Sequence, residues 1–338
     1  MGLGGKMQEP NELKELTLKL SKEGKRPCDI AREIADMWHI DSRSIYNRVK
    51  KYVYKDNLKK IKKANMHQSE EKRVIIQNQE PSAHKSVWDG TTTIKIAIMG
   101  DTQIGSKYTQ WTHFKNFYDI CAEEGIKDVY HTGDITDGLK MRPGHEYELY
   151  EVSADDMLND VITHYPKRPG ITTHFITGNH DASIYKQVGY DIGKAIAGQR
   201  DDMNYLGRDC AVIYLTPNCK LELRHPWDGT AYALSYKTQK MVESMESDSK
   251  PNILAVGHYH KAEYLFYRNV HVLQTGCFQS QTPFTRGKGI SVHIGGWIVT
   301  IKVDKDGTIK SITPQFIPYY SSIADDYKNR YTLNKTNI

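Results

Sequence analysis

The chain has 338 residues, of which 38% are hydrophobic and 26% are charged, as in an ordinary globular protein. This length can bury a large core, with room for one large α/β domain and a small second one. No apolar stretch approaches the ~20 residues that a membrane span needs, and the first residues lack the apolar segment of a signal peptide. The five cysteines are scattered and odd in number. We therefore expect a cytoplasmic protein with reduced thiols and no membrane partner.

Positive charge is concentrated near the start of the chain. Residues 1–65 contain 16 Lys and Arg against 9 Asp and Glu, an excess of seven positive charges, whereas the whole chain has a net charge of +5. The remaining residues therefore carry a net charge of −2. A basic segment of this kind favours a polyanionic partner.

Three short helices are predicted in this basic segment. Hydrophobic residues recur at helical spacing in residues 11–22 and again from Ile30 to Ala35. After a short break, Asp41 or Ser42 can cap a third helix. The pattern resembles a helix-turn-helix of bacterial and phage regulators, in which the last helix enters the major groove of DNA.

The outward positions of the third helix carry basic and amide side chains suited to DNA. Basic groups can contact phosphates, and Asn or Arg can contact base edges. The candidate nucleic-acid contacts are Arg43, Ser44, Asn47, Arg48 and Lys51. We expect DNA as a partner and leave the oligomeric state open. The alternative is a helical bundle used for oligomerisation or docking, with its charges simply solvated.

Composition and pattern divide the chain into four parts. We expect a helical domain over residues 1–58 and a polar linker over residues 59–92, which is rich first in Lys and then in Gln, Asn, Ser and Glu. An α/β domain follows over residues 93–320, and residues 321–338 form a C-terminal tail.

Five predicted strands of the α/β domain each run into polar residues, which is where ligand groups gather in α/β sheets. These residues are Asp101 and Gln103 after residues 94–99, Asp134 and Asp137 after residues 128–132, Asn179, His180 and Asp181 after residues 172–177, His225 after residues 220–224, and His258 and His260 after residues 252–256. One such segment is explained equally well as a turn, but five in order indicate a common site. Their oxygen and nitrogen donors suit hard or borderline divalent cations.

Other segments of this domain have weaker patterns. Residues 187–200 predict a helix. Residues 285–289 predict a flexible basic loop, which either binds phosphate or is an ordinary turn. The loop of residues 138–150, which contains Arg142, His145 and Glu146, leaves directly after Asp137 and either lines a substrate groove or lies on the surface.

The order of the five motifs resembles that of the calcineurin-like metallophosphoesterase superfamily. The superfamily pattern is D-x-H, G-D-x-x-D, G-N-H-D/E, a lone His and G-H-x-H, and four of the five motifs match here while the first is D-x-Q. The resemblance covers roughly residues 93–320. It implies an α/β fold, with a two-sheet β-sandwich flanked by helices, to which the small all-α domain is joined.

The resemblance also implies roles for the motif residues. Two divalent ions would share the carboxylate of Asp134. The further ligands would be Asp101, Gln103 and His260 for one ion, and Asn179, His225 and His258 for the other. His180 would act as general acid or charge stabiliser at the leaving oxygen, oriented by Asp137. Asp181 is expected to brace the turn instead of binding metal.

Gln103 stands where most relatives have a histidine ligand. An amide oxygen is neutral, harder and weaker than an imidazole, so we expect this ion to bind more weakly and to favour Mn or Mg over zinc. We expect two divalent metal ions, with manganese first and magnesium, zinc and iron as alternatives.

The sequence thus predicts a dinuclear-metal-dependent phosphoester hydrolase. We favour a phosphodiesterase or nuclease acting on DNA, because the basic helical domain would bring the site to DNA. Residues 101–105 also resemble the first motif of double-strand-break repair nucleases. One alternative is a phosphatase or phosphodiesterase of nucleotides or phosphoproteins. Another is a DNA-binding regulator with an inactive metal domain, which Gln103 alone favours. The helical domain would fit a phage or bacterial protein.

Overall fold

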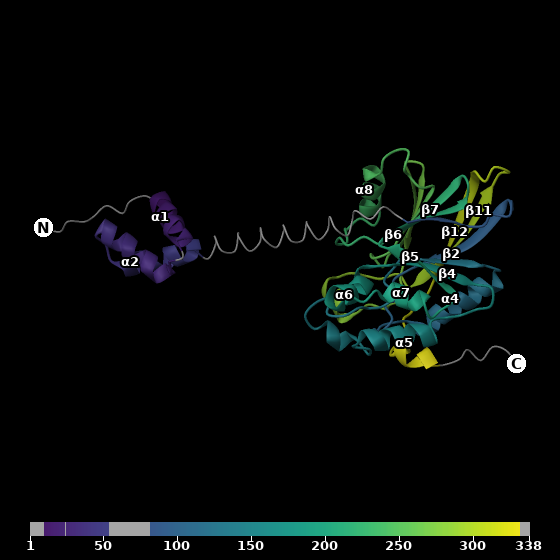
Figure 1. Ribbon diagram of the computed structural model, residues 1–338, viewed down its shortest axis with the longest axis horizontal. Helices are drawn as coiled ribbons and strands as arrows, with labels where there is room; N and C mark the ends of the chain where they lie inside the picture. The colour runs from purple at the N-terminus through teal and green to yellow at the C-terminus, as the bar shows by residue number, and fades with distance from the viewer. Residues whose placement is uncertain (1–9, 24, 54–81, 332–338) are drawn as a thin grey trace. The chain divides into compact units, whose positions relative to one another are not determined.

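The computed structural model describes residues 10–23, 25–53 and 82–331. They belong to two compact units, Met1–Glu80 and Pro81–Ile338 (Figure 1). Among these residues, no helix has the length and apolar character needed to cross a membrane.

The first unit is a small all-α module, as predicted. It contains α1 (Pro10–Lys22), α2 (Pro27–Trp38) and a further helix over residues 42–53. Its core is made of aliphatic side chains from all three helices, namely Leu13, Leu20, Ile30, Ala31, Ile34, Ala35, Ile45, Val49 and Val53. The last helix begins at Asp41, whose carboxylate accepts a hydrogen bond from the Arg43 backbone N–H at 3.2 Å.

The second unit contains two six-stranded sheets within the residues described. One sheet has the order β1-β6-β7-β8-β10-β9 and the other β12-β11-β2-β3-β4-β5. The strands of the first are β1 (Ser82–Lys85), β6 (Cys210–Thr216), β7 (Cys219–Arg224), β8 (Ile253–Val256), β9 (Ala262–Tyr267) and β10 (Val270–Thr275). Those of the second are β2 (Thr93–Met99), β3 (Asp128–His131), β4 (Thr172–Thr177), β5 (Met203–Arg208), β11 (Gly295–Val303) and β12 (Ile309–Pro318).

Helices cover the outer faces of the two sheets (Figure 1). The helices of this unit are α4 (Trp111–Glu123), α5 (Ala154–His164), α6 (Asn179–Val188), α7 (Ile192–Ala197), α8 (Tyr236–Ser244) and α9 (Pro283–Gly287), with 3-10 turns η1 (His145–Glu148) and η2 (Asp326–Tyr331). Aromatic residues of α4 pack on the β2–β5 sheet, and Val242 of α8 packs on the other sheet. The predicted two-sheet sandwich flanked by helices is confirmed.

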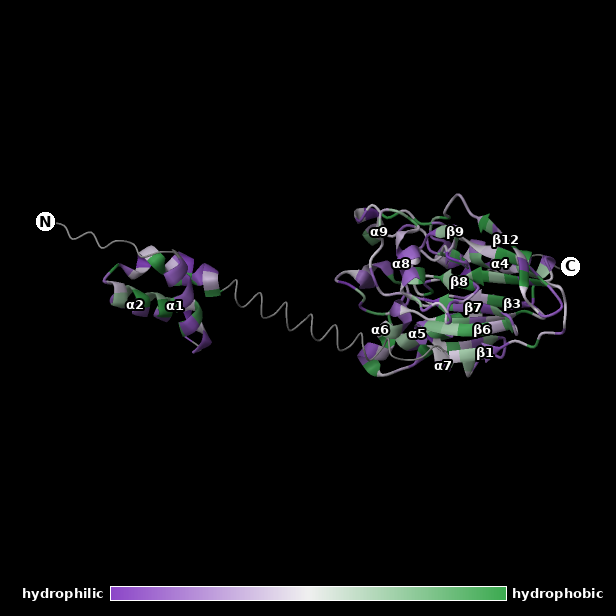
Figure 2. Cartoon of the chain, turned by 90° about the horizontal axis from the view of Figure 1, so that it is seen from above, coloured by the Kyte–Doolittle hydropathy of each residue, from purple (hydrophilic) through white to green (hydrophobic). Residues whose placement is uncertain are grey.

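Both faces of strand β2 pack against hydrophobic cores. Ile96 and Ile98 face the opposite sheet, where they join a core with Leu221 of β7, whereas Ala97 and Met99 join the helix-side core. A strand buried on both faces is almost continuously apolar. In Figure 2, strand β8, which is buried over its whole length, is accordingly mostly green, whereas the helices mix green and purple.

Strand direction brings the ends of five strands together. Strands β2, β3 and β4 run parallel in one sheet, and β7 and β8 run parallel in the other. Each is followed directly by one of the predicted polar motifs. The fold therefore places all five motifs at carboxyl ends of parallel strands, as expected.

Two local predictions are wrong. Residues 187–200 do not form one helix, because α6 ends at Val188 and Gly189 adopts a left-handed conformation (φ 70°) before α7 begins. The basic segment at residues 285–289 is not a flexible loop, since α9 takes up most of it and Thr282 caps that helix by accepting from Thr285 N–H at 3.2 Å.

The folded unit also extends beyond the predicted range of residues 93–320. Strand β1, which pairs with β6, lies within the predicted linker. In the predicted tail, η2 packs on α4, because the Asp326 carboxylate accepts from Thr112 N–H at 2.8 Å. The rest of the predicted linker, residues 59–81, and residues 332–338 of the tail lie outside the residues described.

Candidate active site

The seven predicted metal ligands form one connected cluster. Asp101 and Gln103 follow β2, Asp134 follows β3, and Asn179 is the first residue of α6. The remaining three ligands follow strands of the other sheet, namely His225 after β7 and His258 and His260 after β8. The cluster therefore draws on both sheets, and no single strand or helix could build it.

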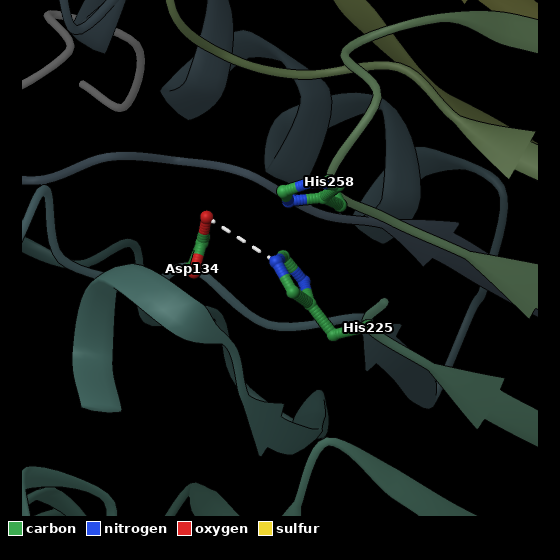
Figure 3. A group of neighbouring side chains, drawn as sticks. All are labelled: Asp134, His225 and His258. Carbon is green, nitrogen blue, oxygen red and sulfur yellow. Dashed lines mark ion pairs between the residues drawn. The ribbon is translucent and has the colours of Figure 1, made fainter. Parts of the chain in front are cut away.

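Asp134 lies at the centre of the cluster. One carboxylate oxygen, Oδ2, is 3.3 Å from His225 Nε2 and accepts a hydrogen bond from Gln103 Nε2 at 3.0 Å. The other oxygen accepts from the backbone N–H of His180 at 2.9 Å. Figure 3 shows Asp134 facing the imidazoles of His225 and His258.

The other ligands fall on two sides of Asp134. On one side, Asn179 Oδ1 lies 3.0 Å from His225 Nε2 and 2.8 Å from His258 Nδ1. On the other side, His260 Nε2 lies 3.4 Å from Asp101 Oδ1 and 3.5 Å from Gln103 Nε2. The two groups are those that the family resemblance implies for two ions, and their roles as ligands stay predictions.

Glycines allow the strand ends to approach so closely. A Cβ atom on Gly178 would overlap Asp134 and lie 2.6 Å from His225 Nε2. Asp181 braces this turn as predicted, since its carboxylate accepts from the backbone N–H groups of Gly178 at 3.0 Å and Thr136 at 2.8 Å.

Five of the seven candidate ligands have left-handed backbone conformations. Their φ angles lie between 50° and 77°, at Asp101, Gln103, Asp134, His258 and His260. Such conformations cost about 1 kcal/mol or more each in residues other than glycine, and they cluster at functional sites. The backbone strain at this cluster therefore favours a functional role over a purely structural one.

The histidines are oriented as metal-binding histidines are. His225 Nδ1 faces the carbonyl oxygen of Thr132 at 2.8 Å, and His258 Nε2 faces that of Asp228 at 2.6 Å. A hydrogen bond from one ring nitrogen to a carbonyl leaves the lone pair of the other nitrogen for a cation. Those other nitrogens both face Asn179 Oδ1, so lone pairs converge on one point.

Gln103 supplies a further test of the fit to metal. Its side chain is fully buried, and its Oε1 atom has no hydrogen-bond partner. An unpartnered buried acceptor costs about 1–3 kcal/mol, which coordination of a cation would recover. The residues present therefore fit divalent metal ions, with Gln103 as an oxygen donor, but their chemistry does not fix which metal.

The pKa values reflect the density of charge in this buried space. Burial lowers the pKa of His225, but the carboxylate of Asp134 outweighs it and raises the pKa to about 9. Burial would raise the pKa of Asp134, but His225 and His180 hold it well below its usual range. The pKa of His258 falls to about 4 through burial and the nearby His225. Without a cation, a proton on the His225 imidazole thus compensates the Asp134 carboxylate.

The predicted catalytic pair lies beside the cluster. His180 Nδ1 is 2.6 Å from the backbone oxygen of Asp137 and 3.1 Å from its carboxylate. Asp137 therefore lies where the prediction requires. Because it contacts Nδ1 of His180, the Nε2 atom of the same ring is left for a substrate. Sequence reasoning did not assign His145 to this group, although its ring centroid is 6.0 Å from that of His180. Its place in a loop directly after Asp137 was the available signal.

The candidate nucleic-acid contacts all lie on the helix of residues 42–53. Their side chains are exposed, at Arg43, Ser44, Asn47, Arg48 and Lys51. The Ser44 hydroxyl donates to the Asp41 carbonyl at 2.6 Å, which ties it to the start of the helix. All five residues are exposed, and their contact with DNA stays a prediction.

Residues 94–274 match the family model described as calcineurin-like phosphoesterase. The chain is 25% identical over 240 residues to a DNA polymerase II small subunit of Methanocaldococcus jannaschii, covering 59% of this chain and 40% of the relative. It is 22% identical over 238 residues to the subunit of the same name from Halobacterium salinarum, covering 60% of this chain and 47% of the relative. The chain thus spans less than half the length of these two curated relatives.

The chain also shows a distant likeness to solved structures. One, titled as a novel archaeal phosphodiesterase, has 13% identity and a TM-score of 0.38, covering 66% of this chain and all of the other. Another, Vps29 from Entamoeba histolytica complexed with Zn²⁺, has 16% identity and a TM-score of 0.34, covering 67% of this chain and 99% of the other. The family model covers more than half of the 338 residues and takes in all five clustered motifs, and the chain belongs to the calcineurin-like phosphoesterase family.

Proposed function

We propose that the protein is a divalent-metal-dependent phosphodiesterase that acts on DNA and reaches it through its N-terminal helices. The observation that carries the proposal is the clustering of six other buried or half-buried donor side chains around Asp134. Bound metal ions would supply positive charge and Lewis acidity at a phosphate.

The side chains of the site support phosphoester chemistry. The seven donors would hold the metal ions, whose positive charge would bind and stabilise a phosphate. His180 then acts on the leaving oxygen through Nε2, while Asp137 holds Nδ1. An imidazole fixed at one nitrogen and free at the other can deliver a proton or stabilise developing charge.

Three features support DNA as the substrate. The first 65 residues have an excess of seven positive charges. The candidate contacts on the helix of residues 42–53 are exposed. The relatives found by sequence are DNA polymerase II small subunits, so proteins with similar sequence are parts of a DNA polymerase.

A panel of substrates tests the proposal. We would assay bis-p-nitrophenyl phosphate, p-nitrophenyl phosphate, and labelled single- and double-stranded DNA in Mn²⁺, Mg²⁺ and Zn²⁺. Asp134→Ala is the inactivating variant, and Asp155→Ala, at an exposed position of α5, is its matched control. We expect diester and DNA cleavage that Asp134→Ala abolishes and Asp155→Ala retains.

The other outcomes identify the alternatives. Monoester turnover with intact DNA would indicate a phosphatase. No turnover in any metal, with DNA still bound, would indicate a DNA-binding regulator. One observation favours this last alternative, because the Gln103 amide donates to the Asp134 oxygen that also faces His225 and could compete with metal there.

A further inference from the structure

His145 is a fully buried histidine for which the proposed chemistry has no role so far. It begins η1, in the loop between β3 and α5, and its side chain has no exposed surface. Its Nε2 atom lies 3.4 Å from Asp137 Oδ2 without the alignment of a hydrogen bond, and it has no other partner. A buried polar atom left in this state needs an explanation.

The loop that carries His145 is anchored to the helix that carries His180. The Ser183 hydroxyl of α6 accepts from Leu139 N–H at 2.8 Å and donates to the His180 carbonyl at 2.6 Å. Farther along the loop, Arg142 and Glu148 form an ion pair at 2.5 Å. These contacts fix the position of His145 relative to His180. The loop therefore holds His145 beside His180 and Asp137 through defined contacts.

Asp137 is shared between the two imidazoles. Its Oδ1 faces His180 Nδ1 at 3.1 Å, and its Oδ2 faces His145 Nε2 at 3.4 Å. Burial raises the pKa of Asp137, but its interactions with His145 and His180 outweigh burial and hold the pKa well below the usual range. The carboxylate is thus kept ionised by a histidine on each side.

We infer that His145 is a positioning residue: it holds the second oxygen of Asp137, so that Asp137 keeps His180 in the ring orientation that presents Nε2 to the leaving group. This inference rests on the proposed function and deepens it. The 3.4 Å separation suits the role, because hydrogen bonds of catalytic groups are often long before substrate binds.

The alternative, a third metal ion bound by Asp137, His145 and His180, fits the proton positions less well. The Nδ1 atom of His145 accepts from the Met141 backbone N–H at 3.4 Å. In the neutral ring the proton is then on Nε2, which faces the carboxylate. A donor at this position suits Asp137 and repels a cation.

Two variants of His145 separate a role of its ring nitrogens in positioning Asp137 from a role of its ring volume in packing. His145→Phe keeps the volume of the ring and removes both nitrogens, whereas His145→Gln keeps an N–H donor. Glu146→Gln, at the exposed next residue of η1, is the matched control. For bis-p-nitrophenyl phosphate we expect His145→Phe to lower kcat on the order of 10- to 100-fold, the usual size for a partner that orients a functional histidine. KM, melting temperature and bound metal should stay unchanged, and His145→Gln should recover part of the rate.

A second measurement needs no turnover. In protein labelled with ¹⁵N-histidine, the Nδ1 proton of His180 should give a protected signal in the wild type and in Glu146→Gln, and should shift or exchange faster in His145→Phe. An unchanged His180 signal, or His145→Phe activity within about twofold of wild type, would overturn the inference. A third equivalent of Zn²⁺ that binds the wild type and not His145→Phe would also overturn it, in favour of a metal site. If the wild type itself hydrolyses nothing, the proposed function fails, and the His180 signal still decides the inference.

Discussion

In the N-terminal module the candidate functional residues are exposed, whereas in the larger unit they are buried or half-buried. Within residues 10–23 and 25–53, the one fully buried polar side chain is Thr17, whose hydroxyl donates to the Leu13 carbonyl at 2.6 Å. The larger unit buries Asp101, Gln103 and Asp134 side by side. Burying polar groups is costly unless they are satisfied, so their presence is evidence of function, while surface charge costs little and says less.

The largest expected effect tests whether the two units act separately. Asp134→Ala removes the carboxylate between the two groups of ligands, and we expect diester hydrolysis to fall by about 10³-fold or more, because metal ions contribute several kcal/mol to phosphoryl transfer. DNA affinity, measured by fluorescence anisotropy, should be unchanged. A parallel loss of DNA binding would mean that the larger unit, and not the module, holds the DNA.

Substitutions in the two cores test whether the smaller unit is the less stable one. Ile34 and Ile98 are both fully buried, one in each unit, and Ile→Ala costs about 2–5 kcal/mol at such positions. A module of this size has about 3–5 kcal/mol of stability, so Ile34→Ala should unfold it. Ile98→Ala should lower the melting temperature of the larger unit and leave it folded.

Calorimetry and limited proteolysis would follow the two transitions. Ile34→Ala should keep hydrolysis of small esters and lose DNA binding. A single cooperative transition that both variants shift equally would contradict the view that each unit is stabilised by its own core.

Charge reversal on the module should have a smaller effect. The triple change Arg43→Glu, Arg48→Glu and Lys51→Glu should weaken DNA binding by about 10- to 100-fold and flatten its salt dependence. Lys14→Glu, Lys19→Glu and Lys22→Glu is the matched control, because it changes the same charge at exposed positions of α1. Equal losses in the two triples would show that overall charge matters and a recognition helix does not.

The smallest expected effect concerns Gln103. Replacing its amide with imidazole in Gln103→His should tighten binding of one Zn²⁺ ion by about tenfold, because imidazole is the better ligand for zinc. Isothermal titration with Zn²⁺ and Mn²⁺ would resolve the two sites. Unchanged affinity for both metals would mean that Gln103 is not a ligand.

The sandwich and the positions of the motifs could be predicted because they follow from local patterns. Strands such as β2 and β4 are rich in β-branched residues, and the polar motif comes at the end of each strand. The start of α6 at Asn179 was missed. Asn, His and Asp are weak helix formers, so the sequence does not predict a helix there. The helix begins at Asn179 because the Asp181 carboxylate accepts a hydrogen bond from Gly178 N–H at 3.0 Å, which caps its first turn.

Other features depend on contacts between distant segments. Strand β1, with the sequence Ser-Ala-His-Lys, has no strand pattern and exists because it pairs with β6 at the edge of a sheet. The place of His145 beside His180 depends on the anchoring of a loop to α6. Strand β1 leaves no signal in one sequence, and the only signal for His145 was its place in the loop after Asp137. The basic helix of residues 42–53, by contrast, could be predicted from the sequence, although its partner could not.

The left-handed backbone at five candidate ligands has a consequence for comparing relatives. At Asp101, Gln103, Asp134, His258 and His260, a side chain kept as a metal ligand would oppose the residue that the backbone prefers, which is glycine or asparagine. A lineage that stopped using metal would be free to drift toward those residues and would gain stability by doing so. The residue types at these five positions in related sequences would therefore distinguish proteins that kept the metal-dependent chemistry from proteins that kept only the fold.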